Sequence, residues 1–159
     1  ILIYGYGAIA KTTILALNSL GAKNIYINGR NKNKLNQLRI SLGLKNYNEK
    51  EFINKKNFFL INCSPLGMMG VSKDKMPFKS NLIKKSSVVM DLINFPSNTK
   101  LIKTAKKNNK KIISGNSISL YQIKYQSEIY LNKKFNSNFL YDLFKKLKIS
   151  FLLFIFLKI

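Results

Sequence analysis

Two glycines and an alanine near the start of the chain have the types and spacing of a phosphate-binding turn. The pattern is G-x-G-x-x-A, formed by Gly5, Gly7 and Ala10 between an apolar run and a helical pattern. The first glycine permits a tight turn, the second lets the backbone approach a pyrophosphate, and the small third residue lets helix and strand pack closely. The N–H groups at the start of that helix would attract phosphates. We expect a dinucleotide site, the alternative being a plain glycine turn, and the site residues would be Gly5, Tyr6, Gly7, Ala8, Ile9 and Ala10.

The residues that follow the next apolar run indicate which dinucleotide would bind. An NAD enzyme usually has Asp or Glu at this place, because a carboxylate accepts a hydrogen bond from the ribose 2′-hydroxyl. Segment 28–34 contains no carboxylate, whereas Arg30 and Lys34 are four residues apart at the start of a predicted helix. Both side chains could face a 2′-phosphate, which a carboxylate would repel. The segment therefore favours NADP over NAD.

Short apolar runs alternate with amphipathic stretches along the chain. We expect strands at residues 1–4, 24–28, 58–62, 87–91 and 111–114, and helices at residues 8–20, 32–42, 100–108, 117–131 and 137–148. The first helix is expected to bury Ile9, Thr13, Leu17 and Leu20. Such alternation predicts an α/β fold with a doubly wound parallel sheet, in one Rossmann-type domain at residues 1–148.

Composition excludes several kinds of chemistry. The chain of 159 residues has one cysteine, Cys63, and no histidine, which excludes a disulfide framework, the usual zinc sites and Ser-His-Asp catalysis. We expect no metal site and interpret Cys63 as a small apolar core residue. The apolar tail at residues 149–159 falls far short of the ~20 residues that span a bilayer. It is expected to pack on the domain or on a missing one, with an interfacial membrane contact as the alternative.

The chain is strongly basic, with 28 Lys and Arg against 6 Asp and Glu and a formal net charge of +22. A balance of this kind often indicates a nucleic-acid or membrane partner. However, only Arg30 and Arg39 are arginines, and the lysines are scattered over every predicted helix. Nucleic-acid sites favour arginine and aromatic platforms. We therefore expect a solvated basic surface and no specific nucleic-acid site.

Three further segments, in order, resemble those of the shikimate and quinate dehydrogenase family. Asn62–Met68 reads N-C-S-P-L-G-M and is similar to the family's nicotinamide-side loop, while residues 91–101 resemble its D-x-x-Y-x-P-x-x-T-x-L segment. Residues 115–122 resemble G-x-G-M-L-x-x-Q. The chain departs from the family at Asn94, where a tyrosine is usual, and at Ser117, where a second glycine is usual.

The resemblance implies roles for individual residues. Arg30, Asn31 and Lys34 would bind the 2′-phosphate, and Gln122 and Asn94 would lie at the substrate. The nicotinamide side would be formed by Ser64, Leu66, Met68, Leu92 and Ser117. The family's catalytic Lys–Asp pair lies in an N-terminal substrate domain that would precede Ile1, so we assign no catalytic residue here. A piece of this kind is expected to bind cofactor without turning over substrate.

The expected function is thus NADP-dependent reduction of 3-dehydroshikimate to shikimate, in aromatic amino-acid biosynthesis and in the cytoplasm. One alternative is a quinate dehydrogenase or another NADP reductase; the P-L-G-M loop and Gln122 argue against a glutamyl-tRNA reductase relative. A further alternative, from a different class, is a non-catalytic basic module that binds nucleic acid or a membrane surface. The choice between shikimate and quinate, and whether the protein forms a homodimer, stay open.

Overall fold

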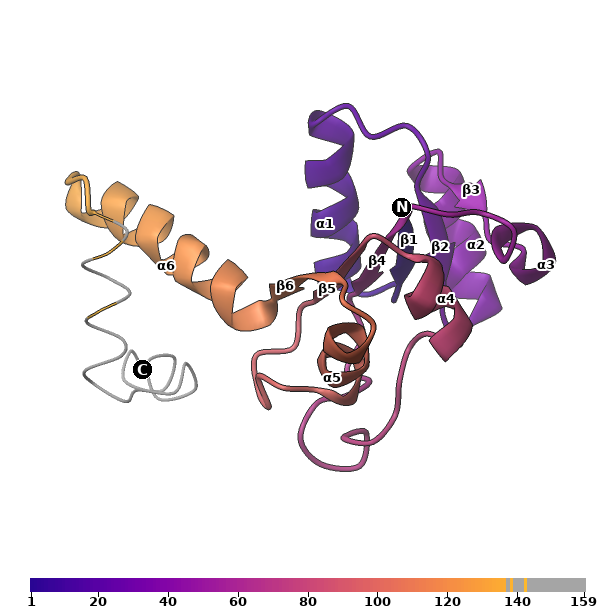
Figure 1. Cartoon of the computed structure of the whole chain (residues 1–159). Coiled ribbons are helices and arrows are strands. Elements are labelled where there is room, and N and C mark those ends of the chain that lie inside the picture. The colour runs from indigo at the N-terminus through magenta and orange to yellow at the C-terminus, as the bar shows by residue number, and fades with distance from the viewer. Residues whose placement is uncertain (137, 139–141, 143–159) are drawn as a thin grey trace. The chain divides into compact units, whose positions relative to one another are not determined.

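Six parallel strands form one sheet in the order β3-β2-β1-β4-β5-β6 (Figure 1). The computed structural model describes residues 1–136, 138 and 142, and the chain divides into a first unit, Ile1–Ser114, and a second that begins at Gly115. The strands are β1 Leu2–Tyr4, β2 Tyr26–Asn28, β3 Lys45–Asn46, β4 Phe59–Asn62, β5 Val88–Asp91 and β6 Lys111–Ser114. This order is that of a doubly wound dinucleotide-binding sheet, so the expected fold class is confirmed.

Helices connect the strands of the first unit, and one long helix opens the second. They are α1 Ala8–Ser19, α2 Lys32–Ser41, α3 Glu49–Phe52, α4 Ser80–Lys85, α5 Lys100–Lys107 and α6 Gly115–Leu131. β3, α3 and α4 are additions to the predicted elements. The helix expected at 137–148 falls largely, and the tail at 149–159 entirely, outside the described residues. None of the helices in the described part is long and apolar enough to cross a membrane.

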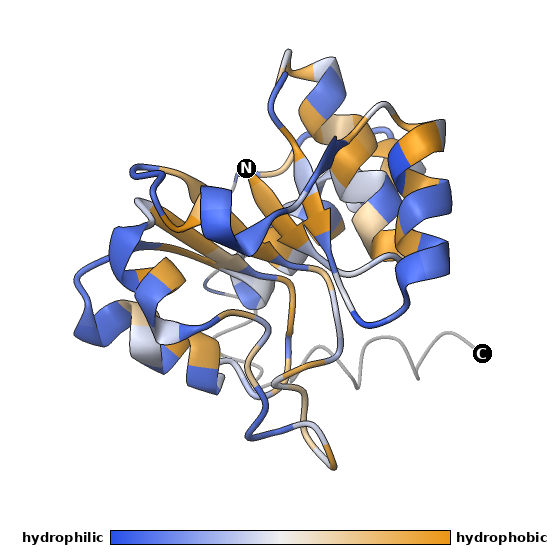
Figure 2. Cartoon of the chain, turned by 90° about the vertical axis from the view of Figure 1, so that its right-hand side faces the viewer, coloured by the Kyte–Doolittle hydropathy of each residue, from blue (hydrophilic) through white to orange (hydrophobic). Residues whose placement is uncertain are grey.

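Apolar side chains cover both faces of the sheet. Leu2 and Leu60 belong to the cluster that packs with α3, α4 and α5, whereas their neighbours Ile3 and Ile61 belong to the cluster that packs with α1 and α2. Successive residues of a strand point to opposite faces, so a strand buried on both sides must be apolar throughout. Figure 2 shows these apolar strands among helices that also carry hydrophilic residues.

The buried stripe of α1 differs from the expected one. Ala10 and Ile14 are 0% exposed, whereas Ile9 and Leu20 are 57% and 84% exposed. The small Ala10 of the glycine motif faces the sheet, and a helix returns to the same face after about 3.6 residues, which selects Ile14 and the half-buried Leu17. The predicted buried face was therefore wrong at Ile9, whose neighbour Ala10 is buried instead, and at Leu20, which is exposed.

The strand register brings the carboxyl ends of five strands to one level. Tyr4 of β1 pairs with Asn28 of β2 on one side and with Asn62 of β4 on the other. Asn62 in turn pairs with Asp91 of β5, and Asp91 with Ser114 of β6. The order reverses at β1, whose neighbours are β2 and β4. Ligands of open α/β sheets bind beyond the carboxyl ends at such a reversal, which places the loops after these strands where a ligand is expected.

Candidate functional site

Gly5 forms the turn from β1 to α1 in contact with the loop that follows β4. Its N–H donates to Asn28 O at 2.9 Å, and its φ of +132° lies in a region that side chains disfavour. A Cβ at this position would lie 2.7 Å from the carbonyl oxygen of Cys63. Two loops from neighbouring strands thus meet at the reversal point, and only glycine lets them approach so closely.

Gly7 opens α1 without a side-chain cap. Asn31, Asn48 and Thr99 cap α2, α3 and α5 with side-chain oxygens, whereas α1 begins at a glycine that has no side chain to offer. The first N–H groups of a helix have no partner within the helix. A Cβ on Gly7 would meet nothing within 4 Å, so the space before these donors is open. An uncapped helix start with open space before it can accept a phosphate.

The loop from β2 to α2 is positive and free of carboxylates. Arg30 and Lys34 are exposed, and Arg30 makes no ion pair within the described residues. Asn31 Oδ1 accepts from the N–H of Lys34 at 3.0 Å, so this side chain caps α2. No Asp or Glu occurs in the sequence before Glu49. The loop therefore offers cations, and no anion, to a ligand bound at the glycine turn.

Tyr6 of the glycine turn contacts the loop from β2 to α2. Its half-buried ring lies against Gly29, where a Cβ would come within 3.0 Å of Tyr6 Cδ1. The N–H of Gly29 also donates to Asn28 Oδ1 at 2.8 Å. The start of the positive loop is consequently held next to the start of α1, by a ring contact that the spacing of the motif does not reveal.

The loop after β4 is fixed by the side chain of Asn62, which is 0% exposed. Asn62 Oδ1 accepts from Ser64 N at 3.0 Å and from Ser64 Oγ at 2.7 Å, while Asn62 Nδ2 donates to Leu66 O at 3.0 Å. Gly67, with a φ of +102°, packs on Thr99, whose Cβ lies 3.4 Å from the Cβ position of Gly67. Ser64 and Leu66 are half-buried in this loop and Met68 is 48% exposed.

Asp91 ends β5 and is 1% exposed. Its carboxylate accepts from Thr99 Oγ1 at 2.6 Å, from Asn62 Nδ2 at 2.9 Å and from Ile93 N at 3.3 Å. Burial raises the pKa of Asp91 above its ordinary value, and these three hydrogen bonds oppose that rise. Neither Asp91 nor its partners Asn62 and Thr99 were among the expected site residues. The sequence feature that could have indicated Asn62 and Asp91 is a polar residue at the end of each of two apolar strands.

Cys63 is buried beside the glycine turn. Its Sγ donates to Thr13 Oγ1 of α1 at 3.7 Å. Burial raises the pKa of the Cys63 thiol to about 11, against the hydrogen bond with Thr13, which lowers it. The thiol stays protonated at neutral pH and is no nucleophile. This agrees with the interpretation of Cys63 as a small core residue.

The remaining expected residues lie in both units. Leu92 and Asn94 are half-buried in the loop between β5 and α5 of the first unit. Ser117 and Gln122 are exposed on α6 of the second unit. The first unit therefore brings the glycine turn, the positive loop and the loops after β4 and β5 together along one edge of the sheet, while Ser117 and Gln122 belong to the second unit.

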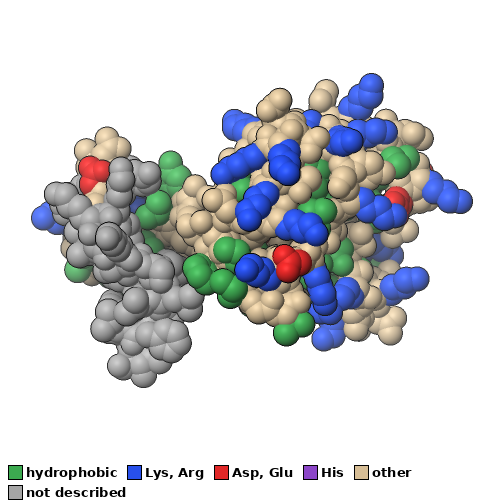
Figure 3. All heavy atoms as spheres, turned by 60° about the horizontal axis from the view of Figure 1, so that its bottom comes forward, with side chains coloured by type: hydrophobic (Ala, Val, Ile, Leu, Met, Phe, Trp, Pro, Cys, Tyr) green, Lys and Arg blue, Asp and Glu red, His purple; other side chains and the backbone are tan. Residues whose placement is uncertain are grey.

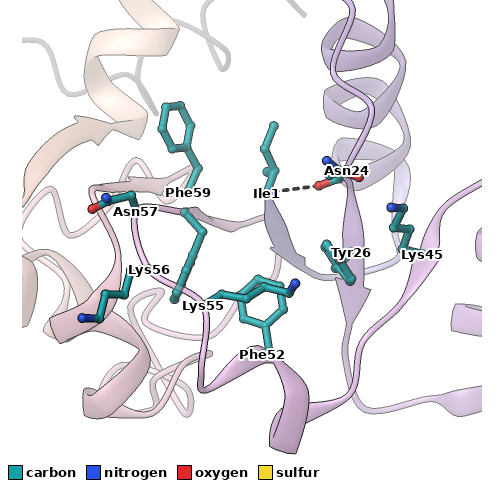
Figure 4. A pocket seen from close by; sticks show the side chains of 10 residues that line it. Ile1, Asn24, Tyr26, Lys45, Phe52, Lys55, Lys56, Asn57 and Phe59 are labelled. Carbon is teal, nitrogen blue, oxygen red and sulfur yellow. Dashed lines mark hydrogen bonds between the residues drawn. The ribbon is translucent and has the colours of Figure 1, made fainter.

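A hollow of about 700 Å³ lies at the opposite edge of the sheet, by the amino ends of the strands. Its lining includes three lysines, Lys45, Lys55 and Lys56, and the rings of Tyr26 and Phe52 (Figure 4). Ligands of this fold class bind at the carboxyl ends, so the hollow does not belong to the dinucleotide site. The described residues contain no group of His, Cys, Asp and Glu able to hold a metal ion.

Lysine and arginine side chains are spread across the face of the molecule in Figure 3 and form no single dense patch there. On this face the basic side chains are therefore not gathered at one place. Position within the fold, and not abundance, thus distinguishes Arg30 from the other basic residues.

No family model matches the chain, but curated proteins and solved structures are similar to it. The shikimate dehydrogenase (NADP(+)) of Clostridium botulinum strain Hall is 37% identical over 122 residues, which are 76% of this chain and 46% of that protein. A solved chorismate mutase/shikimate 5-dehydrogenase fusion protein from Clostridium acetobutylicum is 27% identical with a TM-score of 0.77, covering 92% of this chain and 52% of its own. The Thermus thermophilus shikimate 5-dehydrogenase in complex with NADP(H) and shikimate has a TM-score of 0.77 at 16% identity, over 91% and 54% of the two chains, a likeness of fold. The chain spans about half the length of the curated relatives it matches.

Proposed function

Because this chain belongs to the shikimate dehydrogenase family, we propose that it is the NADP-binding half of an enzyme that interconverts 3-dehydroshikimate and shikimate. The relatives that carry the name shikimate dehydrogenase (NADP(+)) match 76% and 91% of this chain. Their remaining half would supply the catalytic groups and most of the substrate contacts. Residues 1–148 would act as the cofactor-binding domain.

The observation that carries the proposal is the uncapped start of α1 at the reversal point of the sheet. Gly7 leaves the first N–H groups of the helix without a side-chain partner, and a Cβ there would occupy otherwise open space. A pyrophosphate fits this place, because it accepts several N–H bonds and its charge is favoured by the helix dipole. The backbone from Gly5 to Ala10 would therefore hold the centre of the dinucleotide.

Arg30 would select NADP over NAD. Its exposed guanidinium stands in a loop without carboxylates, next to Lys34 and the cap residue Asn31. A guanidinium can bind a phosphate through two parallel hydrogen bonds, which neither the 2′-hydroxyl of NAD nor a lysine reproduces. We assign Arg30 the main contact to the 2′-phosphate and Lys34 a supporting charge.

The loops after β4 and β5 would form the nicotinamide side. Ser64, Leu66, Met68 and Leu92 would shape this pocket. The bound cofactor would supply the hydride, while these residues orient the ring and limit access of water. Asn94 of the first unit would contact the substrate.

Calorimetric titration of the chain with NADP⁺ and NAD⁺, repeated for Arg30→Ala, tests the proposal. NADP⁺ should bind more tightly than NAD⁺. Arg30→Ala should weaken NADP⁺ roughly tenfold to a hundredfold, as expected for losing charge-assisted hydrogen bonds of about 1.5–3 kcal/mol. The same substitution should leave NAD⁺ binding almost unchanged, because NAD⁺ lacks the 2′-phosphate.

Arg39→Ala provides the matched control, since Arg39 is the other arginine of the chain and lies in the last turn of α2, the helix that follows Arg30. The substitution removes the same charge, from a side chain that donates to Asn36 Oδ1 within α2. It should retain the preference for NADP⁺. A folded chain that binds neither nucleotide would contradict the proposal, as would equal losses in the two arginine variants.

A further inference from the structure

Asp91 is an unusual carboxylate for a chain of this charge. It is 1% exposed, and among the described residues it takes part in no ion pair although the chain has 28 basic residues. Its partners are a hydroxyl, an amide and a backbone N–H, all neutral donors. Burying a charge without a cation is costly, and hydrogen bonds offset only part of the cost. A residue that merely filled this space could be apolar, so the carboxylate indicates a further role.

The carboxylate dictates how Asn62 is oriented. An ionised Asp only accepts hydrogen bonds, so Asn62 must direct its Nδ2 group toward Asp91 Oδ1, at 2.9 Å. That orientation turns Asn62 Oδ1 toward Ser64, whose N and Oγ both donate to it. The second Nδ2 hydrogen is then available for Leu66 O. The hydrogen bonds of the loop after β4 are thus linked through Asn62 to a residue on the neighbouring strand.

The other carboxylate oxygen fixes the segment that leads into α5. Asp91 Oδ2 accepts from Thr99 Oγ1, and Thr99 Oγ1 accepts from Ile102 N as the cap of the helix. Gly67 of the β4 loop packs on this same Thr99. Both loops beside the expected nicotinamide position are therefore attached to one buried side chain.

We propose that Asp91 is a positioning residue, which acts through Asn62 and Thr99 to hold both nicotinamide-side loops in their binding conformation. The inference rests on the proposed function, because it assigns those loops to the nicotinamide half of NADP. It implies that Asp91 matters for one half of the dinucleotide only. The glycine turn and Arg30 lie outside the network and should bind the adenosine half without it.

Asp91→Asn and Asp91→Ala test this by comparing NADP⁺ with adenosine 2′,5′-bisphosphate, which lacks the nicotinamide half. In Asp91→Ala the affinity for NADP⁺ should fall roughly tenfold, as for loss of buried charge-assisted hydrogen bonds. Asp91→Asn keeps the shape and one acceptor, so its loss should be smaller. Affinity for the bisphosphate should stay within about twofold in both variants. Equal weakening of the two ligands, or no weakening of NADP⁺, would overturn the proposal.

Amide hydrogen exchange without ligand gives an independent readout. The Ser64 N–H donates to Asn62 Oδ1, so its exchange should accelerate on the order of tenfold in Asp91→Ala while the amides of α1 keep their rates. Val89→Ala is the control, because Val89 is a 0% exposed residue of the same strand whose loss destabilises the core without touching the network. Equal acceleration in both variants would overturn the role of Asp91.

Failure of the proposed function gives a different pattern. A parent chain that bound neither NADP⁺ nor the bisphosphate would contradict NADP binding. The exchange measurement would still decide whether Asp91 holds the loop after β4.

Discussion

At the scale of single residues, the two glycines of the first turn are under different constraints. Gly5 has a φ of +132° and no room for a Cβ beside Cys63 O, whereas Gly7 has a φ of −81° and open space before it. Gly5→Ala should therefore lower the free energy of unfolding by about 2 kcal/mol or more, through strain and a backbone clash. Gly7→Ala should change it by no more than about 1 kcal/mol. Urea denaturation of both variants measures the difference.

Nucleotide binding should test Gly7 independently of stability. The Gly7→Ala chain stays folded, yet its methyl group would occupy the place proposed for the pyrophosphate, so NADP⁺ affinity should fall by at least roughly tenfold. Wild-type affinity in a folded Gly7→Ala chain would show that the open space at Gly7 is not the pyrophosphate site.

Single residues also show where sequence reasoning ends. Arg30 could be singled out because its type and its place after a strand carry the information. The hydrogen bond from Asn62 to Asp91 could not be predicted, because it requires that β4 and β5 pair in the register Asn62↔Asp91. Hydrogen-bond partners that are 29 residues apart in sequence follow from strand pairing and side-chain orientation, which local patterns do not specify.

At the scale of elements, those with clear apolar patterns were predictable and the short ones were not. The strands with apolar runs and the helices α1, α2 and α5 lie within about two residues of their expected bounds, the usual uncertainty of helix ends. β3 is the two-residue Lys45–Asn46 strand at the sheet edge, with both residues exposed, so no apolar run marks it. α3 and α4 have four and six residues, too few to show a period.

The corrected face of α1 leads to a testable contrast between two isoleucines of one helix. Ile14 is 0% exposed and Ile9 is 57% exposed. Ile14→Ala should lower the free energy of unfolding by about 2–5 kcal/mol, because it leaves a cavity under α1. Ile9→Ala should cost less than about 1 kcal/mol, since little area is lost and alanine favours helices. Thermal or urea unfolding of the two variants measures this difference. Similar losses of unfolding free energy in both would support the original prediction that Ile9 is buried.

At the scale of the whole molecule, the net charge of +22 and the nucleotide site are separate properties. The basic side chains are dispersed over the face shown in Figure 3, whereas the proposed 2′-phosphate contact depends on Arg30 in one loop. Dispersed charge attracts any polyanion and is screened by salt, while a short contact in a fixed geometry is screened much less. The two properties should therefore respond differently to ionic strength.

Binding measured between 50 and 200 mM NaCl should separate them. Affinity for a duplex DNA of random sequence should fall by roughly a thousandfold or more, through release of condensed counterions. NADP⁺ has only a few charges, so its affinity should fall by no more than about tenfold. The preference for NADP⁺ over NAD⁺ should persist in the parent chain and in Arg39→Ala, and should disappear in Arg30→Ala at both salt concentrations. A preference that vanished with salt in the parent would mean that the general positive field, and not Arg30, selects the nucleotide. The chain would then resemble the basic binding module that the sequence left as an alternative.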